Sequence, residues 1–489
     1  MEIKELKPSG IWTYFDEVTK VPRPSKKESK VIQYLLDFAR QHNLEAEKDE
    51  AGNVLIRKKA TPGKENLETV ILQSHMDMVC EKNKEVEFDF ENDPIQTYID
   101  DGWVKAKGTT LGADDGIGVA AQLAILASDN IEHGALECLF TVDEETGLTG
   151  AFSLKKGFLT GKVLINLDTE EEGEFYVGCA GGKNTIATFT YQKEQVPDNY
   201  FWFKVEVKGL NGGHSGSEIH LGLGNANKIL TRYLSDLAQH GEVLLSKIDG
   251  GNLSNAIPRE AVAVAGVPSS LKEKTRSLLN ILLAEVEAEL KGVDDRITLT
   301  LESVETPAFC VDKKTGYRLL NALYACPHGV MGINRDAKAK GEDLVETSTN
   351  LASVKMKEED KIVVTTSQRS FSNSLKIDTA NMVTAVFTLA GAKVEGTDGY
   401  PGWKPNYNSQ ILLIAEKVYS DLYGNKPIIK AIHAGLECGL FLEKYPYLDM
   451  ISCGPTIKGA HSPDEKLEIV TVEKWWKLLI ELLKNIPVK

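Results

Sequence analysis

The sequence lacks the features that assign a chain to several special classes of protein. Its seven cysteines form no C-x-x-C pair, so the common zinc-thiolate and dithiol motifs are excluded and no disulfide framework is predicted. No apolar run approaches the roughly 20 residues that span a membrane, and the N-terminus has no apolar export segment. We therefore expect a cytoplasmic protein without a membrane anchor or a membrane partner.

Blocks of basic residues are missing as well. The 56 Lys and Arg residues are outnumbered by 71 Asp and Glu residues, which gives a formal net charge of −15. An acidic surface repels the phosphates of nucleic acids and of anionic lipids, so neither is expected as a partner. With 489 residues the chain also exceeds what one hydrophobic core usually supports, and at least two domains are predicted.

What the chain does contain is a set of apolar strands that end in polar residues. Strands are predicted over residues 70–74, 135–142 and 163–167. The residues that follow them are His75 and Asp77, Asp143 to Glu145, and Asp168. A lone His-x-Asp pair is more often a surface or structural feature, but here the same ending recurs. Because the carboxyl ends of parallel strands open into one crevice of an α/β sheet, we expect these side chains to meet there.

Two further groups complete a set of metal-ligand types. Asp114 and Asp115 immediately precede a helical run over residues 119–127, and His461 lies in a loop near the C-terminus. Together with the strand ends, the chain offers two histidines and several carboxylates at the ends of ordered elements. This is the ligand inventory of a hydrolytic site with two divalent metal ions.

The order of the predicted elements indicates an α/β fold with a discontinuous catalytic domain. Residues 1–187 alternate strands and helices, as in a mixed sheet that is parallel at its centre and lies between helices. The next segment follows the β-α-β-β-α-β order of a ferredoxin-like α+β module, and a second, incomplete copy comes after it. Since His461 belongs chemically with His75, we expect residues 188–398 to form an inserted two-lobed domain and residues 399–489 to complete the first domain.

These residues, in this order, resemble the cocatalytic zinc peptidase family that includes carboxypeptidase G. The resemblance covers essentially the whole chain, and three longer segments are similar to the aminoacyl-histidine dipeptidase (β-alanyl-histidine dipeptidase) branch of that family. The three segments are residues 400–406, 433–439 and 454–463. The resemblance implies a zinc-peptidase catalytic domain and makes the insert a lid domain.

For the metal ions, the resemblance implies that Asp114 bridges both. His75 and Asp168 would bind one ion, and Glu145 and His461 the other. Two divalent ions per chain are therefore expected, with Zn²⁺ as the first choice, although Mn²⁺ and Co²⁺ also suit such ligands.

The resemblance also assigns the proton-transfer chemistry. Glu144 would take a proton from the attacking water and pass it to the leaving amine; the alternative is a plain surface carboxylate at a strand end. Asp77 would fix the orientation of the His75 ring, while Asp115 would only cap the helix. The family commonly has Lys two residues after the bridging Asp, where this chain has Gly116, a branch difference that leaves the ligand set intact.

Substrate contacts are expected from the insert and from one later loop. The resemblance makes His214 the group that stabilises the tetrahedral oxyanion, often from the neighbouring subunit of a dimer, so a homodimer through the lid domain is expected. Asn255 lies in a substrate-binding segment, and Arg369 would clamp the substrate carboxylate, unless it is a solvated strand charge. Gly435 would bring the backbone close to the substrate.

The function predicted from these features is a metal-dependent dipeptidase that acts on unblocked dipeptides of the Xaa-His type, such as β-Ala-His. A chemically adjacent alternative is a metalloamidase that removes an acyl group from an amino acid. A non-catalytic peptide-binding protein on the same fold is a third hypothesis. It gives no reason for Glu144 to stand beside Glu145, so the enzyme hypotheses are preferred.

Overall fold

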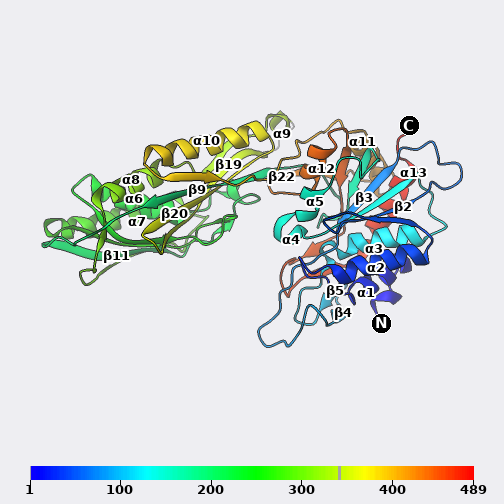
Figure 1. Cartoon of the computed structure of the whole chain (residues 1–489), viewed down its shortest axis with the longest axis horizontal. Coiled ribbons are helices and arrows are strands. Elements are labelled where there is room, and N and C mark those ends of the chain that lie inside the picture. The colour runs from blue at the N-terminus through cyan, green and yellow to red at the C-terminus, as the bar shows by residue number, and fades with distance from the viewer. Residues whose placement is uncertain (1, 340–342) are drawn as a thin grey trace. The chain divides into compact units, whose positions relative to one another are not determined.

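The computed structural model of the chain describes residues 2–339 and 343–489. The chain divides into two compact units, which are described separately (Figure 1). Unit 1 comprises the chain up to Cys179 together with Trp403–Ala431 and Leu436–Lys489. Unit 2 comprises Ala180–Gly402 together with Ile432–Gly435. Unit 2 thus begins at residue 180 and its long segment ends at residue 402, whereas the sequence places these borders at residues 188 and 398.

Unit 1 is built on an eight-stranded mixed sheet. The strand order is β1-β2-β6-β3-β7-β23-β8-β22, and the central strands β6, β3, β7 and β23 run parallel. Every residue of β3, β6 and β7 is buried, as expected for strands covered on both faces. The strands are β1 (Glu45–Lys48), β2 (Val54–Lys58), β3 (Val70–His75), β6 (Leu136–Thr141), β7 (Val163–Asn166), β8 (Glu174–Cys179), β22 (Ile428–Ile432) and β23 (Asp449–Ser452).

Helices cover this sheet, and a small second sheet flanks it. The helices are α1 (Ser9–Val18), α2 (Ser29–Gln41), α3 (Ala113–Ala127), α4 (Glu144–Gly147), α5 (Thr149–Ser153), α11 (Gln410–Tyr423), α12 (Cys438–Lys444) and α13 (Ile469–Lys484). The four strands of the small sheet, in spatial order, are β24 (Ile457–Lys458), β25 (Lys466–Glu468), β5 (Trp103–Ala106) and β4 (Thr97–Asp100).

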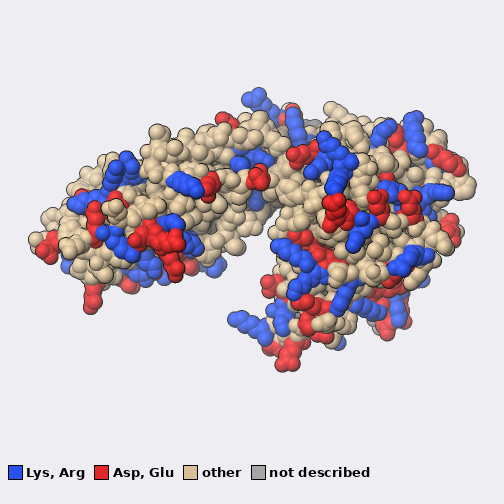
Figure 2. Space-filling view, viewed as in Figure 1, with Lys and Arg blue, Asp and Glu red and all other residues tan. Residues whose placement is uncertain are grey.

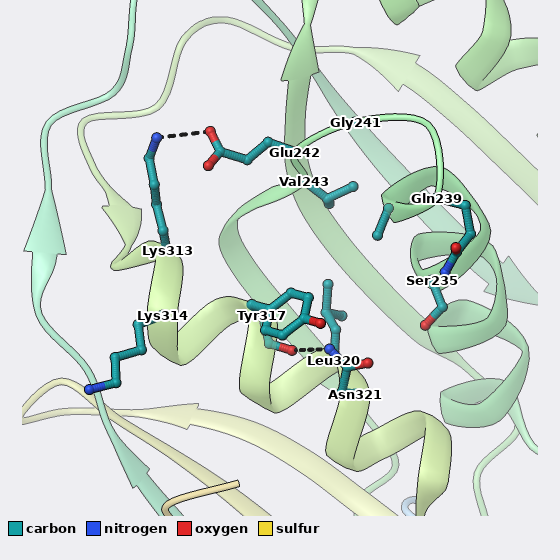
Figure 3. Close-up of a pocket in the computed structure, with 11 residues that line it drawn as sticks. Ser235, Gln239, Gly241, Glu242, Val243, Lys313, Lys314, Tyr317, Leu320 and Asn321 are labelled. Atoms are coloured by element: carbon teal, nitrogen blue, oxygen red, sulfur yellow. Dashed lines mark hydrogen bonds and ion pairs between the residues drawn. The ribbon is translucent and has the colours of Figure 1, made fainter.

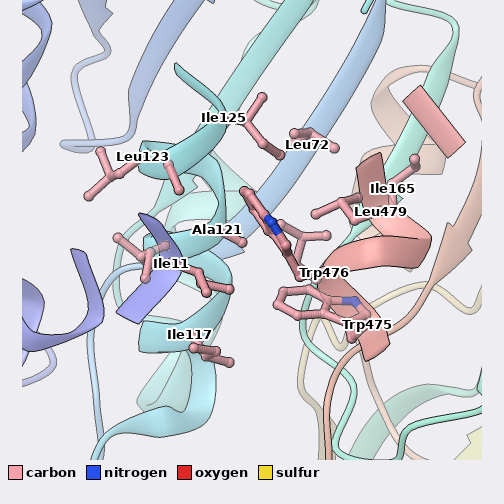
Figure 4. Packing of buried hydrophobic residues seen from close by; sticks show 14 of the residues in the cluster. Ile11, Leu72, Ile117, Ala121, Leu123, Ile125, Ile165, Trp475, Trp476 and Leu479 are labelled. Carbon is pink, nitrogen blue, oxygen red and sulfur yellow. The ribbon is translucent and has the colours of Figure 1, made fainter. Parts of the chain in front are cut away.

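The core of unit 1 lies between α3, α13 and the central strands (Figure 4). Ile117, Ala121 and Ile125 recur on one face of α3 at the helical period and are almost completely buried. On α13, Trp475 and Leu479 belong to the same cluster. Each large apolar side chain buried in this way contributes about 1.5–3 kcal/mol to folding. This packing fixes α3, and therefore the loop that precedes it, against the sheet.

Unit 2 contains one nine-stranded antiparallel sheet made of two ferredoxin-like lobes. In the first lobe the strand order is β16-β11-β15-β13, with α6 and α7 as its helices; in the second it is β19-β20-β9-β21, with α8 and α10. The strands are β9 (Gly181–Thr190), β11 (Tyr200–Lys208), β13 (Leu244–Gly250), β15 (Ala261–Pro268), β16 (Thr298–Ser303), β19 (Val345–Lys357), β20 (Lys361–Ser370) and β21 (Lys393–Gly396), and β18 (Gly329–Ile333) also pairs with β19. The helices are α6 (Ala226–Ala238), α7 (Lys272–Glu289), α8 (Lys313–Ala325), α9 (Arg335–Ala339) and α10 (Asn373–Leu389).

The two lobes join edge to edge. Asp249 and Gly250 of β13 pair with Lys355 and Val354 of β19, so the sheet runs without interruption from one lobe to the other. The strand missing from the second copy in the sequence is β9, which precedes the whole first lobe in the chain. The first lobe is therefore inserted between the first strand and the first helix of the second, and the expected border at residue 188 falls inside β9.

One face of the molecule shows how its charged side chains are distributed (Figure 2). On the face shown in Figure 2, Lys and Arg side chains are interspersed with Asp and Glu side chains, and no continuous basic surface is visible there. None of the helices in the described part of the chain is long and apolar enough to cross a membrane.

Candidate active site

The predicted ligands of unit 1 come together where its central strands end. His75 is the last residue of β3, and its Nε2 lies 3.0 Å from Asp114 Oδ1 and 3.7 Å from Asp168 Oδ1. Ligand atoms of His75, Asp114 and Glu145 lie within 4.8 Å of one another. His461, which has a positive φ of 63° uncommon outside glycine, joins them from its loop.

Asp114 lies at the centre of this group. Its Oδ1 is next to His75, and its Oδ2 lies 3.1 Å from His461 Nε2. The same His461 nitrogen lies 3.0 Å from Glu145 Oε2. Each oxygen of Asp114 thus faces one of the two histidines, so the carboxylate separates two sets of side chains: His75 with Asp168, and His461 with Glu145.

The electrostatics of the group show an excess of negative charge. Hydrogen bonds to Asp114 and Glu145 raise the pKa of His461 to about 11. Burial alone would lower the pKa of His75, but the neighbouring carboxylates outweigh it and raise that pKa. Burial also raises the pKa of Asp168 and of Glu144. Such a crowd of carboxylates with imidazole nitrogens is a donor set that fits divalent cations.

Asp77 connects His75 to the predicted proton-transfer residue. Its Oδ1 lies 3.4 Å from His75 Nδ1 and accepts a hydrogen bond from the Glu144 backbone N–H at 3.0 Å. The other oxygen accepts from Ser25 Oγ at 2.7 Å and from the Glu145 N–H at 3.3 Å. Asp77 therefore lies beside the His75 ring and fixes the start of α4, which carries Glu144 and Glu145.

Two buried residues that the sequence analysis missed hold the Asp114 loop. The carboxylate of Glu465 accepts four backbone N–H groups, from residues 111 to 114, at distances of 2.7 to 3.2 Å. The Arg23 guanidinium donates to the carbonyl oxygens of Met76, Asp77 and Gly112. Neither residue lies in a recognisable motif, although an anion below a helix N-terminus is favourable on general grounds.

The position of Arg23 also explains why residue 116 is a glycine. A Cβ on Gly116 would lie 2.6 Å from Arg23 Nη2, so the glycine leaves room for the guanidinium. Asp115 accepts the Gly118 N–H at 3.1 Å, which is the helix-capping role expected for it.

The predicted substrate residues belong to unit 2. His214 and Asn255 line an open pocket of about 500 Å³ next to the β12–β14 pair, β12 (Gly213–His214) with β14 (Ala256–Ile257). The Nδ1 of His214 accepts backbone N–H groups from Gly216 at 3.3 Å and Ser217 at 3.0 Å. Because a backbone N–H can only donate, the ring proton must be on Nε2. Burial lowers the pKa of His214 to about 4, so at neutral pH the ring is a neutral Nε2–H donor.

Arg369 of the second lobe lies next to this histidine of the first lobe. A Cβ on Gly216 would be 3.0 Å from His214 Cε1, 3.2 Å from Arg369 Cδ and 2.3 Å from the His433 carbonyl oxygen. Only a glycine permits so close an approach. His214 and Arg369 are therefore neighbours within one chain, without a second subunit.

Gly435, which is expected to bring the backbone close to the substrate, lies against the ring of Tyr400. A Cβ at this position would lie 2.8 Å from Tyr400 Cε2, so among the described residues Gly435 makes space for an aromatic ring.

A second pocket of unit 2, about 660 Å³, lies between α6 and α8 (Figure 3). Two of its charged groups form an ion pair, as Lys313 Nζ lies 2.9 Å from Glu242 Oε2. The Asn321 amide donates to the Tyr317 carbonyl oxygen at 2.8 Å. This pocket brings none of the predicted site residues together.

The chain is similar to known proteins in both sequence and structure. Residues 71–485 match the sequence model of Peptidase family M20/M25/M40. The chain is 44% identical to the cytosol non-specific dipeptidase of Escherichia coli K12 over 488 residues, which covers 100% of both chains. It is 45% identical to the crystal structure of aminoacylhistidine dipeptidase from Vibrio alginolyticus, with a TM-score of 0.91 over 100% of this chain and 99% of the other. Aminopeptidase PepT from Bacillus cereus, at 16% identity and a TM-score of 0.57 over 98% and 99% of the two chains, shares the fold.

Proposed function

Because the chain belongs to Peptidase family M20/M25/M40, we propose that it is a metal-dependent dipeptidase that hydrolyses unblocked dipeptides, including those of the Xaa-His type. Relatives over the full length that are named as dipeptidases support this choice within the family. A cytoplasmic location is proposed with it, since the E. coli relative is named as a cytosolic enzyme.

The observation that carries the proposal is the position of Asp114 between the two histidines. Its two oxygens lie 3.0 Å from His75 and 3.1 Å from His461, a position from which the carboxylate would hold two cations. We assign His75 and Asp168 to one divalent ion and Glu145 and His461 to the other, with zinc as the proposed metal. Ions bound there would lower the pKa of a water molecule and polarise the scissile carbonyl group.

The side chains of unit 1 supply the remaining chemistry. Glu144, held by its backbone N–H on Asp77, accepts the proton of the attacking water and returns it to the leaving amine. The raised pKa of Glu144, due first to burial, suits a group that must both accept and release a proton. Asp77 keeps the His75 ring in one orientation.

Unit 2 supplies substrate binding, in the role of a lid. Arg369 is only 6% exposed, and no carboxylate forms an ion pair with it in the described part of the chain. A buried cation without a counter-ion favours an anionic ligand, and the C-terminal carboxylate of a dipeptide is one. His214 donates from Nε2 to the oxyanion, and Asn255 binds the substrate from the same pocket. A homodimer through unit 2 stays a prediction.

The experiment that tests the proposal compares substrates and metals. Purified protein is depleted of metal, reloaded with zinc, manganese or cobalt, and assayed with dipeptides, tripeptides and N-acyl amino acids. We expect hydrolysis of dipeptides only, with about two ions per chain. Full activity after thorough metal depletion would contradict metal dependence. A preference for N-acyl amino acids would favour the amidase instead.

A further inference from the structure

The Arg369 guanidinium has fewer partners than a buried cation needs. Its one hydrogen bond to the described residues is from Nη1 to the Tyr400 hydroxyl, at 2.9 Å. The Nε atom is buried without a partner. A guanidinium carries five N–H donors, so several of them remain available to a ligand.

The Tyr400 hydroxyl also has a donor available for a ligand. Its oxygen accepts the Arg369 N–H, which leaves the phenolic proton to be donated elsewhere. No described residue accepts a hydrogen bond from this hydroxyl. The Tyr400 hydroxyl and the remaining N–H groups of Arg369 are therefore neighbouring donors, and both can bind the same acceptor.

The phenol ring is held in place by two glycines that are far apart in sequence. A Cβ on Gly182 would lie 2.6 Å from Tyr400 Cζ, and one on Gly435 would lie 2.8 Å from Cε2. Any side chain at either position would collide with the ring, so both residues must be glycine for the ring to lie there. The ring is thus confined by backbone rather than by flexible side chains.

The backbone of the same residues fixes the spacing between the ring and Arg369. Arg369 pairs with Gly182 in the β20–β9 register, strands that run side by side in Figure 1. Tyr400 bridges Gly182 from the other side, by hydrogen bonds of 3.1 and 2.9 Å in the two directions. The Lys376 ammonium also donates to the Tyr400 carbonyl oxygen. Gly182 therefore connects the two donors through one short stretch of sheet.

From this arrangement we propose that Tyr400 is a second substrate-binding residue of the carboxylate clamp. Its hydroxyl donates to the same carboxylate that Arg369 binds, so that the pair selects substrates with a free C-terminus. Gly182 and Gly435 are positioning residues, which act on the substrate only through the ring. This inference rests on the proposed function of Arg369 and adds the residues that complete the site.

The first test is Tyr400→Phe, which removes the hydroxyl and keeps the ring. For a free dipeptide we expect KM to rise about tenfold, the loss of one hydrogen bond to a charged group, with kcat nearly unchanged. For the corresponding dipeptide amide, KM should stay the same. Tyr447→Phe is the matched control, since Tyr447 is 54% exposed and its hydroxyl forms no hydrogen bond to the described residues. Equal changes on both substrates, or no change on either, would overturn the proposal.

The second test asks whether Gly435 acts through the Tyr400 ring or contacts the substrate itself. Gly435→Ala should raise KM in the wild-type protein, because it displaces the ring, and should have no effect in a Tyr400→Ala background, where the space is empty. A glycine that contacts the substrate directly would give the same loss in both backgrounds, which would contradict the positioning role. Thermal melting of each variant checks that it folds.

The same data distinguish failure of this inference from failure of the proposed function. If Arg369→Ala discriminates free dipeptides from amides and Tyr400→Phe does not, only the role of Tyr400 is refuted. If neither does, the carboxylate clamp itself is wrong.

Discussion

The two units have opposite unsatisfied charges. In unit 1, His75, Asp114, Glu145, Asp168 and His461 crowd together with an excess of negative charge. In unit 2, the buried Arg369 guanidinium has, among the described residues, only the Tyr400 hydroxyl as a hydrogen-bond partner. Each arrangement is costly in the protein alone, because buried charge is tolerated only when it is compensated. The difference supports the proposal that unit 1 binds cations and unit 2 binds an anion.

The largest expected effect is the loss of metal and activity when a proposed ligand of unit 1 is removed. Asp114→Ala removes the carboxylate proposed to bridge both ions, so bound metal should fall well below two per chain and hydrolysis should become undetectable. Metal analysis and a dipeptide assay measure the two quantities on one preparation. His75→Ala and His461→Ala should behave alike. A variant that keeps its metal and its activity would show that Asp114 is not a ligand.

The next effect separates chemistry from metal binding within unit 1. Glu144→Gln keeps the shape of the side chain and leaves the five proposed ligands intact. We expect kcat to fall by roughly 10² to 10⁴, the range of general acid–base catalysis, while metal content and KM are retained. Steady-state kinetics with metal analysis checks this. Hydrolysis at the wild-type rate would remove Glu144 from the mechanism.

On the anion side, Arg369→Ala should lower kcat/KM for free dipeptides by some two to three decades, roughly the loss of a charge-assisted bidentate contact. The decrease should be much smaller for dipeptide amides, which offer no carboxylate, and metal content should not change. Kinetics on the matched pair of substrates measures the difference. Equal losses on both substrates would assign Arg369 a structural role.

His214 tests whether unit 2 works within one chain. His214→Ala should lower kcat roughly a hundredfold, as expected for one oxyanion donor. If His214 acts within its own chain, mixing His214→Ala chains with Glu144→Gln chains should give only the mean of the two activities. Restored activity in the mixture would show that the histidine acts across a dimer.

The smallest effect concerns the stability of unit 2 in acid. Burial lowers the pKa of His433 to about 3, whereas an unfolded histidine titrates near about 6.5. Between these values the unfolded state binds more protons, so the free energy of unfolding should decrease as pH falls from about 6.5, by at most a few kcal/mol for this group. His433→Gln should flatten the dependence of the melting temperature on pH, and the exposed His240→Gln should not. Identical profiles for wild type and His433→Gln would contradict this.

Much of unit 1 could be predicted from the sequence. The α/β fold, the mixed sheet and the peptidase family are confirmed. His75 and Asp168 could be found because each directly follows a short apolar run, and the ends of neighbouring parallel strands must meet. The roles of these side chains remain predictions, although the structure brings all five proposed ligands together.

In unit 2, the sequence predicts individual strands and helices but not how all of them pair. Phe201, Phe203, Val205 and Val207 alternate with other residues in the sequence, the period of two expected of a strand buried on one face, and they lie in β11. The first strand of the second lobe, β9, could not be assigned to that lobe from the sequence, because the whole first lobe separates it from α8. Sequence order carries no signal for a pairing interrupted by so long an insertion.

By itself, the sequence determined the identities of the chemical groups and the elements that end in them, since both depend on neighbours within a few residues. Only the tertiary structure decided which distant groups complete the sites. Glu465 accepts the N–H groups before α3 from about 350 residues away, and Gly182 and Gly435 enclose Tyr400 from two separate segments. Such contacts depend on the exact approach of packed backbones, and no local pattern of residues encodes that distance.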